Sequence, residues 1–257
     1  MALTVSRGNM YEWVTHCHSH LRGACPHECS YCYVKSYRNQ EPWQGPVRLA
    51  EKELTVNYGL PWTDGRGCHE AGDPKTIFIE HSSDLFAKGV PDEFIARILA
   101  HALVWPRNTY LYQSKNPDRI LQWLPLMQTR VIFGTTIETN YPIEGSKAPH
   151  PRDRYEAMMA LRGEVDDNSV YGQEGPRDQL MLTIEPIMKF DLDTLSRWVL
   201  DIKPDFVNIG ADSKGHNLPE PTWSEVLALV DALAKGGVKV NHKSNLERLK
   251  RKEEGHA

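Results

Sequence analysis

Several features that would place a protein in a special class are absent from this 257-residue sequence. No apolar run approaches the ~20 residues that a membrane-spanning helix needs, so a membrane-embedded chain is excluded. The opening residues MALTVSRGNMYEW lack the long apolar stretch of a secretory signal, and we therefore expect a cytoplasmic protein. The formal net charge is only −4, so no overall positive field attracts nucleic acid, although a local basic groove stays compatible with it.

Cysteine is scarce, yet its distribution is uneven. The chain has five cysteines, and three of them, Cys25, Cys29 and Cys32, stand in the segment CPHECSYC. In a reducing compartment, clustered cysteines indicate a metal or redox site before they indicate disulfides. The other two stand apart, and we expect a buried apolar thiol at Cys17 and an ordinary loop thiol at Cys68.

The three clustered thiolates leave two kinds of metal site open. A structural zinc ion takes four protein ligands, so Cys17 or a nearby histidine would have to complete the set. A cubane iron–sulfur cluster normally takes four thiolates, so three would leave one iron open to a small molecule with nitrogen and oxygen donors. The second arrangement is typical of a catalytic site, and the first of a structural one.

Short apolar segments alternate with helix-like segments along most of the chain. This alternation predicts parallel βα units, with the strands covered by helices. The expected strands are 76–81, 109–114, 130–137, 180–186, 205–210 and 238–243, with a weaker candidate at 11–17. The expected helices are 91–104, 117–127, 152–163, 191–202 and 222–237, the last capped by Thr222 or Ser224 and ended by Gly236 and Gly237.

Polar side chains gather where these strands end. In parallel sheets the carboxyl ends of the strands form the site, so six such ends predict one shared cavity. The groups that follow the successive strands are His81 to Asp84, Ser114 and Lys115, Thr136 and Glu138, Glu185, Asp212 and Lys214, and His242 and Lys243.

The CPHECSYC segment resembles the CxxxCxxC loop of the radical S-adenosylmethionine (SAM) superfamily, including the aromatic Tyr31 directly before the last cysteine. Residues 10–245 also resemble a narrower, phage-associated radical SAM-like family. This likeness rests on the segments SSDLFAKGVPDEFI, QSKNPDRI, FGTTIETN, IEPIM and VNIGADSKG. A weaker similarity to the spore photoproduct lyase family, whose members act on DNA, rests on Ser83–Asp84, Lys115 and Thr136.

The resemblance implies an α/β fold, a partial (β/α)6 TIM-type barrel with parallel strands. It would span residues 1–245, with the cluster loop at 25–32 and a charged, solvated tail at 246–257. It also implies that Cys25, Cys29 and Cys32 hold a [4Fe–4S] cluster whose fourth iron chelates SAM. A small electron donor such as flavodoxin or ferredoxin would supply one electron. SAM would then be cleaved to a 5′-deoxyadenosyl radical that takes a hydrogen atom from the substrate.

Roles toward SAM follow from the same resemblance. Ser83 and Asp84 are expected to bind its ammonium group, although both residues are also good helix caps. Lys115 would pair with its carboxylate, unless it forms a surface ion pair. Three further sets of residues are expected to contact the rest of SAM: Thr136 and Glu138 the ribose, Gly210 and Tyr31 the adenine, and Glu185 either SAM or a basic neighbour.

Candidate substrate contacts are His16, His18 and Lys243. In THCHSH the histidines alternate, so in a strand they share one face. Facing inward they would line the substrate cavity, and facing outward they would be surface residues. Lys243 ends the last predicted strand and would contact substrate or close the barrel rim.

Three functions stay open at this point. The first is a radical SAM isomerase, mutase or lyase acting on a modified thymine or nucleotide in phage DNA, because phages often remodel their DNA bases. The second is a radical SAM enzyme acting on a peptide or a small metabolite. The third is a non-enzymatic zinc protein that binds nucleic acid.

Overall fold

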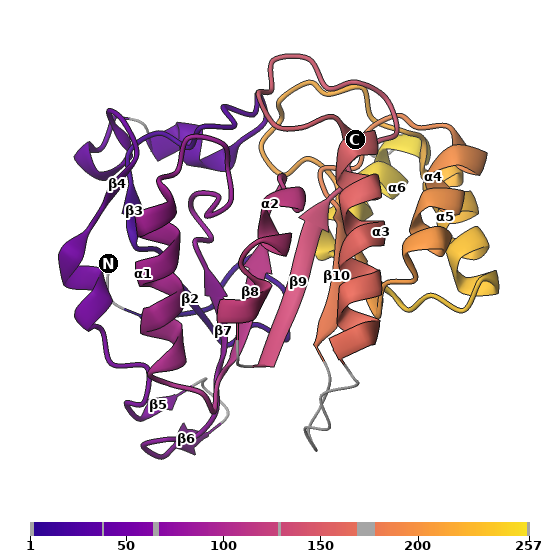
Figure 1. Cartoon of the computed structure of the whole chain (residues 1–257). Helices are drawn as coiled ribbons and strands as arrows, with labels where there is room; N and C mark the ends of the chain where they lie inside the picture. The colour runs from indigo at the N-terminus through magenta and orange to yellow at the C-terminus, as the bar shows by residue number, and fades with distance from the viewer. Residues whose placement is uncertain (1–2, 38, 64–66, 128–129, 169–177, 256–257) are drawn as a thin grey trace.

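Runs of β-branched and aromatic residues form the main sheet, in keeping with their preference for extended backbone. The computed structural model describes residues 3–37, 39–63, 67–127, 130–168 and 178–255. The sheet has eight strands in the order β1-β2-β7-β8-β9-β10-β11-β12 (Figure 1). These strands are β1 (Thr4–Val5), β2 (His16–His18), β7 (Thr76–Ile79), β8 (Thr109–Gln113), β9 (Arg130–Thr136), β10 (Gln179–Ile184), β11 (Phe206–Ile209) and β12 (Val240–His242).

Every neighbouring pair from β2 to β12 is parallel, and only β1 runs antiparallel to its neighbour. Within the described residues the two outer strands, β1 and β12, do not pair with each other, so the barrel is open. The predicted α/β fold with a partial TIM-type barrel is confirmed. The first strand is shorter than predicted, because Val14 donates its N–H to Tyr11 O in a turn and extended pairing starts only at His16.

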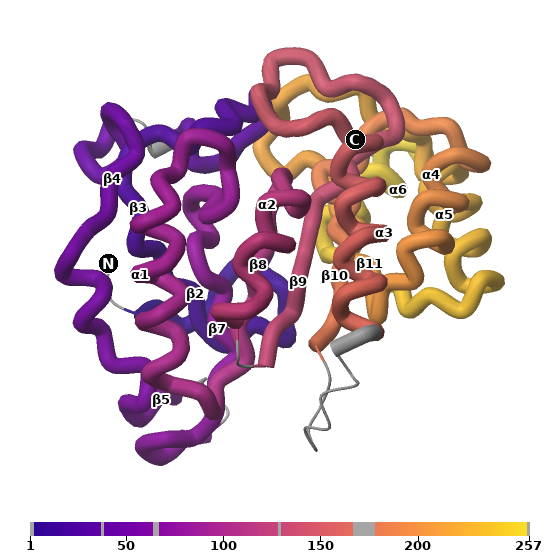
Figure 2. Tube along the Cα trace, in the orientation of Figure 1, coloured from indigo at the N-terminus to yellow at the C-terminus, as the bar shows by residue number. Residues whose placement is uncertain are grey.

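From β7 onward, helices connect the parallel strands and cover the outer face of the sheet, as the chain trace in Figure 2 shows. Thr222 caps α5 through a capping box with Glu225, and the helix ends at Gly236, as predicted. The helices are α1 (Asp92–Leu103), α2 (Asp118–Leu121), α3 (Pro151–Asn168), α4 (Leu192–Ile202), α5 (Trp223–Lys235) and α6 (Glu247–Glu253).

Short 3-10 turns and short antiparallel strand pairs complete the fold. None of the helices in the described part of the chain is long and apolar enough to cross a membrane. Two antiparallel pairs are β3 (Leu21–Arg22) with β4 (Arg48–Leu49), and β5 (Trp62–Thr63) with β6 (Cys68–His69). The 3-10 turns are η1 (Tyr33–Tyr37), η2 (Glu41–Trp43), η3 (Glu51–Thr55), η4 (Leu124–Leu126) and η6 (Ser244–Leu246).

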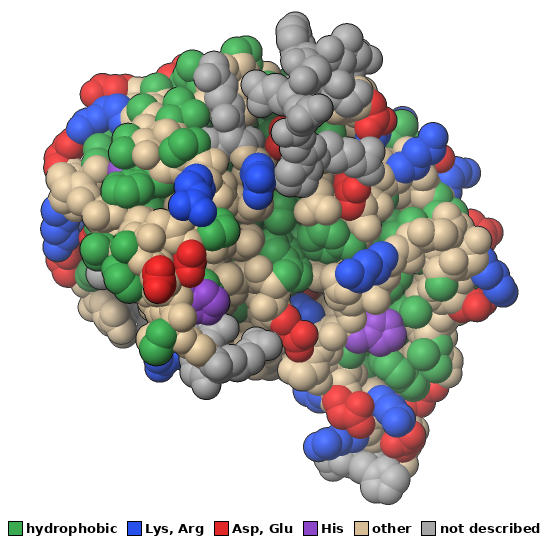
Figure 3. Space-filling view, turned by 90° about the horizontal axis from the view of Figure 1, so that it is seen from below, with side chains coloured by type: hydrophobic (Ala, Val, Ile, Leu, Met, Phe, Trp, Pro, Cys, Tyr) green, Lys and Arg blue, Asp and Glu red, His purple; other side chains and the backbone are tan. Residues whose placement is uncertain are grey.

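The charged C-terminal segment differs from the expected solvated tail. Its helix α6 buries Leu249, and Leu246 just before it is also buried. Arg248 forms an ion pair with Glu220, so this basic side chain is held by the fold. Positive and negative side chains are interspersed over the lower face of the molecule (Figure 3).

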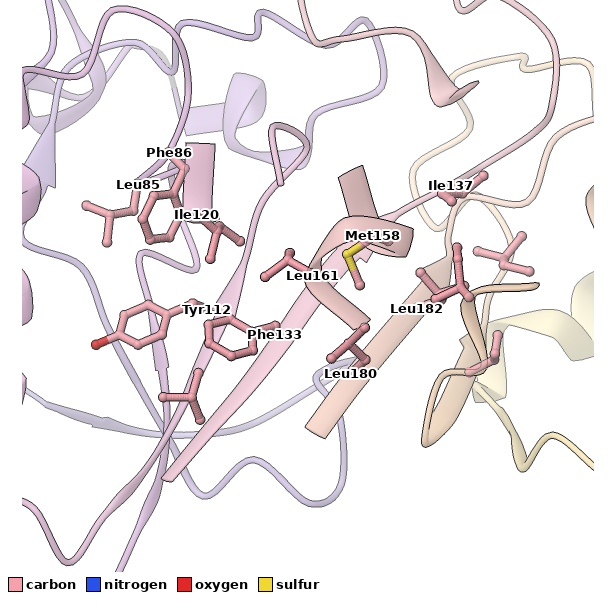
Figure 4. Close-up of a cluster of buried hydrophobic side chains, with 14 of the residues drawn as sticks. Leu85, Phe86, Tyr112, Ile120, Phe133, Ile137, Met158, Leu161, Leu180 and Leu182 are labelled. Carbon is pink, nitrogen blue, oxygen red and sulfur yellow. The ribbon is translucent and has the colours of Figure 1, made fainter. Parts of the chain in front are cut away.

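The two faces of the sheet carry separate apolar clusters. On the outer face, strand residues such as Phe133 and Leu180 pack against Met158 and Leu161 of α3 (Figure 4). On the inner face, Tyr11 from the N-terminal segment covers a layer with one side chain per strand. That layer consists of Cys17, Phe78, Leu111, Ile132, Met181 and Phe206. Cys17 is therefore a buried apolar thiol, as predicted.

Candidate active site

The CPHECSYC segment follows β3 and reaches the carboxyl edge of the sheet. Its cysteines are all free thiols; Cys29 is buried, and Cys25 and Cys32 are half-buried. The chain enters the loop through Gly23, whose φ is +92°. A Cβ at that position would lie 2.1 Å from the carbonyl oxygen of Pro46, so only glycine permits this entry.

A second loop, residues 139–150, lies over the cysteine loop and is called the clamp loop here. It arches along the upper edge of the molecule in Figure 2. Lys147 donates its N–H to His27 O at 2.7 Å, and Ser146 Oγ lies 3.5 Å from Cys29 Sγ. The clamp loop thus fixes the cysteine loop from outside, and these contacts place the thiols between it and the strand ends.

The buried carboxylate of Glu138, just after β9, is the centre of a charged cluster at the strand ends. We call it the Glu138 cluster: Glu138, Tyr31, Lys115 and Arg154. Lys115 Nζ lies 3.0 Å from Oε1 of Glu138, and Arg154 Nη1 donates to Oε2 at 2.8 Å. The Tyr31 hydroxyl also donates to Glu138, and Lys115 sits over the Tyr31 ring.

The carboxylate of this cluster and its two cations stabilise each other's charged forms. Glu138 is fully buried, and burial alone would raise its pKa, but Lys115 and Arg154 outweigh burial and lower it. Burial, followed by the charge of Glu138, raises the pKa of Tyr31 well above its usual range. The Glu138 cluster therefore holds a carboxylate, two cations and a neutral phenol beside the cysteine loop.

Asp84, after β7, joins the cysteine loop to β8. His27 Nε2 lies 2.8 Å from its carboxylate, and the Ser114 hydroxyl donates to it at 2.7 Å. The Lys115 backbone N–H donates to it as well, at 2.7 Å. Burial would raise the pKa of Asp84, but His27 and the hydrogen bonds lower it, so it stays anionic. Half-buried Ser83 precedes it directly.

Glu185, after β10, pairs with Lys243, the residue after β12, at 2.7 Å. Its other oxygen accepts from Asn9 and Asn245, each at 3.0 Å. A Cβ on Gly210 would lie 2.7 Å from the Glu185 carboxyl group, so glycine is needed to seat this side chain. The structure thus gives Glu185 a basic neighbour, which was one of its two expected partners.

Thr136 and Lys243 belong to one polar layer at the barrel interior. Thr136 Oγ1 accepts from Gln113 Nε2 at 3.1 Å, and Gln113 Oε1 accepts from the Tyr11 hydroxyl at 2.9 Å. Lys243 Nζ lies 4.9 Å from the centre of the Tyr11 ring. The predicted strand-end residues therefore fall into two neighbouring sets, one around Glu138 and Asp84 and one around Glu185.

The structure corrects both alternatives expected for His16 and His18, which neither line the barrel interior nor lie at the surface. The residue between them, Cys17, belongs to the inner cluster, so both imidazoles point to the outer face of the sheet. His16 packs edge-on against Trp62, and His18 stacks on His20 with the ring centres 4.4 Å apart. They are not surface residues either, since both are almost fully buried.

His18 is part of a second buried polar group, called the histidine cluster. His20 Nδ1 lies 2.9 Å from Glu80 Oε1, and His20 Nε2 lies 3.0 Å from His101 Nδ1 of α1. His18 Nε2 lies 3.3 Å from Glu53 Oε2, and neither ring nitrogen of His18 forms a well-aligned hydrogen bond with a described residue. Burial, followed by His20 and His101, lowers the pKa of His18 to about 2. The histidine cluster comprises His18, His20, His101, Glu53, Glu80, Tyr58 and Arg22.

Sequence reasoning missed Arg154 and the contact of His27. Arg154 lies in the first turn of α3, in the segment RDRYEAM, where it resembles its exposed neighbour Arg152. Only the packing of α3 against β9 distinguishes them. His27 had a weak signal, because its position inside the cysteine loop places it near whatever binds there.

The residues around the cysteine loop can be compared with the ligands that a [4Fe–4S] cluster and SAM require. Three free thiols share one loop, and a cation on Lys115 and an anion on Asp84 lie beside it. Within the described ranges, no three His, Cys, Asp or Glu side chains converge on a single metal ion. A cubane spreads its thiolates over separate irons, so it does not require such convergence. The residues present therefore fit the cluster and an amino-acid group of SAM.

Comparisons with known proteins found structural likeness only. No protein-family model matches the chain, and no curated protein matches its sequence. A mutant of spore photoproduct lyase aligns with a TM-score of 0.54 and 10% identity, over 93% of this chain and 80% of that one. SuiB from Streptococcus suis, bound to S-adenosylmethionine, aligns with a TM-score of 0.54 and 9% identity, over 89% of this chain and 50% of that one.

Another mutant of spore photoproduct lyase was solved with bound AdoMet and dinucleoside spore photoproduct. It aligns with a TM-score of 0.50 and 11% identity, over 90% of this chain. This chain spans 64% of the length of that protein and half the length of SuiB. At these identities the likeness shows a shared fold, a partial barrel of parallel strands.

Proposed function

We propose that this chain is a radical SAM enzyme. The observation that carries the proposal is the position of Cys25, Cys29 and Cys32, on one loop at the carboxyl edge of a partial barrel. When bound there, a [4Fe–4S] cluster with SAM would supply a 5′-deoxyadenosyl radical that takes a hydrogen atom from the substrate. The electron would come from a small donor such as flavodoxin or ferredoxin.

The residues around the loop would bind and orient SAM. Lys115, whose side chain is 18% exposed, would receive the carboxylate, and anionic Asp84 with Ser83 would attract the ammonium group. Tyr31 would lie beside the adenine. Glu138 is fully enclosed by its partners, so it would act through Lys115 and leave the ribose to Thr136.

For the substrate we propose a nucleobase, as a modified thymine or nucleotide, with an isomerase, mutase or lyase reaction. The fold likeness to a protein solved with a dinucleoside spore photoproduct supports this choice, and so does the resemblance to a phage-associated family. Lys243, in the interior polar layer, is the candidate substrate contact. A base taken out of a duplex would cost a few kcal/mol in lost stacking.

The metal test comes first. Protein reconstituted without oxygen should hold about four irons per chain and, once reduced, release 5′-deoxyadenosine from SAM. The triple variant Cys25→Ala, Cys29→Ala, Cys32→Ala should lose the iron, whereas Cys17→Ala and Cys68→Ala should keep it. Tightly bound zinc with no iron would point instead to a zinc protein and overturn the proposal.

The substrate test measures the transfer of a deuterium label from the substrate to 5′-deoxyadenosine. Deuterium placed on the modified group of a thymine nucleotide should appear in 5′-deoxyadenosine. DNA binding should be weak, because the net charge is −4, and it should fall with salt, because each phosphate contact is weakened by salt. Label transfer from a peptide or a metabolite, with no nucleotide binding at low salt, would move the chain to that second substrate class.

A further inference from the structure

Arg154 is the residue of the Glu138 cluster to which no role has yet been given. Its guanidinium is only 1% exposed. Besides its bond to Glu138, it donates to Thr136 O at 2.9 Å and to Pro149 O at 2.8 Å. One side chain thus holds the end of β9, the clamp loop and the buried carboxylate together.

Arg154 also affects the net charge of the Glu138 cluster. Glu138 carries one negative charge and faces two cations, Lys115 and Arg154, so the cluster has one positive charge in excess. Arg154 is enclosed, whereas the Lys115 side chain keeps 18% of its surface exposed beside the cysteine loop. An arriving anion would therefore meet the ammonium of Lys115 and not the guanidinium of Arg154.

Arg154 also lines two outer cavities. A cavity of about 460 Å³ lies between α2 and α3, and one of about 200 Å³ lies under the clamp loop. Arg154 and Pro149 line both of them. A shorter side chain at this position would open a path for water to the carboxylate and screen its interactions.

We propose that Arg154 is a positioning residue for the carboxylate of SAM. It neutralises Glu138 from behind and so leaves the ammonium of Lys115 available to the ligand. Without it, Lys115 would be the sole counter-ion of a buried carboxylate and would be held by it. The inference rests on the proposed function, because it takes SAM as the ligand.

The test compares charge variants after reconstitution without oxygen, with SAM affinity measured by equilibrium dialysis and iron counted in each sample. Arg154→Gln should keep its iron and bind SAM about tenfold to a hundredfold more weakly, the usual effect of losing a charged hydrogen-bond partner. The double variant Arg154→Gln, Glu138→Gln should regain most of that affinity, because Lys115 is then free again. Arg154→Lys, which keeps the charge, should stay near wild type.

Matched controls separate the causes. Arg152→Gln removes an exposed arginine from the same helical turn and should change nothing. Thermal unfolding of each variant checks that it is folded. Wild-type affinity in Arg154→Gln, or no recovery in the double variant, would overturn the positioning role while the proposed function stands. Wild-type protein that holds no iron or binds no SAM would overturn the proposed function itself.

Discussion

The Glu138 cluster and the histidine cluster are both buried groups of ionisable side chains, but they differ in position and in charge. The Glu138 cluster combines three charged side chains with the neutral Tyr31, and one of its cations, Lys115, reaches the edge of the cysteine loop. The histidine cluster lies on the outer face of β2 against α1. Burial lowers the pKa of its member His18 far below the ordinary value, so this imidazole is neutral at neutral pH.

This difference shows that buried ionisable residues need not mark a site. Permanent charges at strand ends are expensive to bury, so they call for partners or a ligand. In the histidine cluster the buried carboxylates are paired, Glu53 with Arg22 and Glu80 with His20, and the neutral ring of His18 adds no further buried charge. The next three experiments test whether the two clusters differ in this way.

The largest expected effect is on folding stability. Glu138→Leu leaves the almost fully buried Arg154 as a cation without its counter-ion, so the free energy of unfolding should fall by about 3–5 kcal/mol. Urea unfolding at neutral pH measures it. Glu51→Leu breaks an exposed pair with Arg97 and should shift the midpoint little. Equal effects of the two changes would contradict a tightly charged Glu138 cluster.

The next effect is the response of the histidine cluster to acid. The pKa of His18 is lowered from 6.5 to about 2. As the pH falls through 6.5, the unfolded chain takes up a proton that the folded chain refuses, so stability is lost as the pH falls. Between pH 7 and pH 5 this one group should cost about 2 kcal/mol.

The measurement is the free energy of unfolding at both pH values. His18→Phe should flatten the slope by about one proton, because phenylalanine fits an apolar ring site and cannot titrate. The exposed His150 offers the control His150→Gln, which should keep the full slope. An unchanged slope in His18→Phe would mean that His18 is already charged in the folded state.

The smallest expected effect is on ligand affinity. His16→Leu and His18→Phe should leave SAM affinity within about twofold of wild type, because both rings lie on the outer face. Lys115→Ala, in contrast, should weaken SAM binding by about tenfold or more. Equilibrium dialysis of the reconstituted proteins measures the SAM affinity of the histidine variants and of Lys115→Ala. A large loss in either histidine variant would return those residues to the site.

The alternation of strands and helices predicted the fold, because parallel βα units leave a strong periodic pattern. The pattern also predicted that His16 and His18 share a face. It could not say which face, since Cys17 between them is equally compatible with the inner and the outer side. Partner identity decides this question, and the partners, Trp62 and His101, are distant in sequence.

Arg154 could not be predicted for a similar reason. Its burial depends on how closely α3 approaches β9, and nothing in the helix pattern sets Arg154 apart from Arg152. The tail carried a readable signal that was missed: Leu246 and Leu249 stand three positions apart, at the spacing of one helical face. For Glu185 the sequence predicted a basic neighbour as one alternative, but it did not identify that neighbour as Lys243.

The hydrogen bonds of Asn9 have a consequence for how the molecule forms. Asn9 bonds to Glu185, 176 positions away, and to Ser213, 204 positions away. Contacts between residues so far apart in sequence are typical of slow folding steps. During synthesis the segment around Asn9 emerges early and waits for its partners until the last strands are made. Tyr11, two positions further on, can pack on Phe78 and bond to Gln113 much earlier, so the apolar side of this segment can assemble before its polar side.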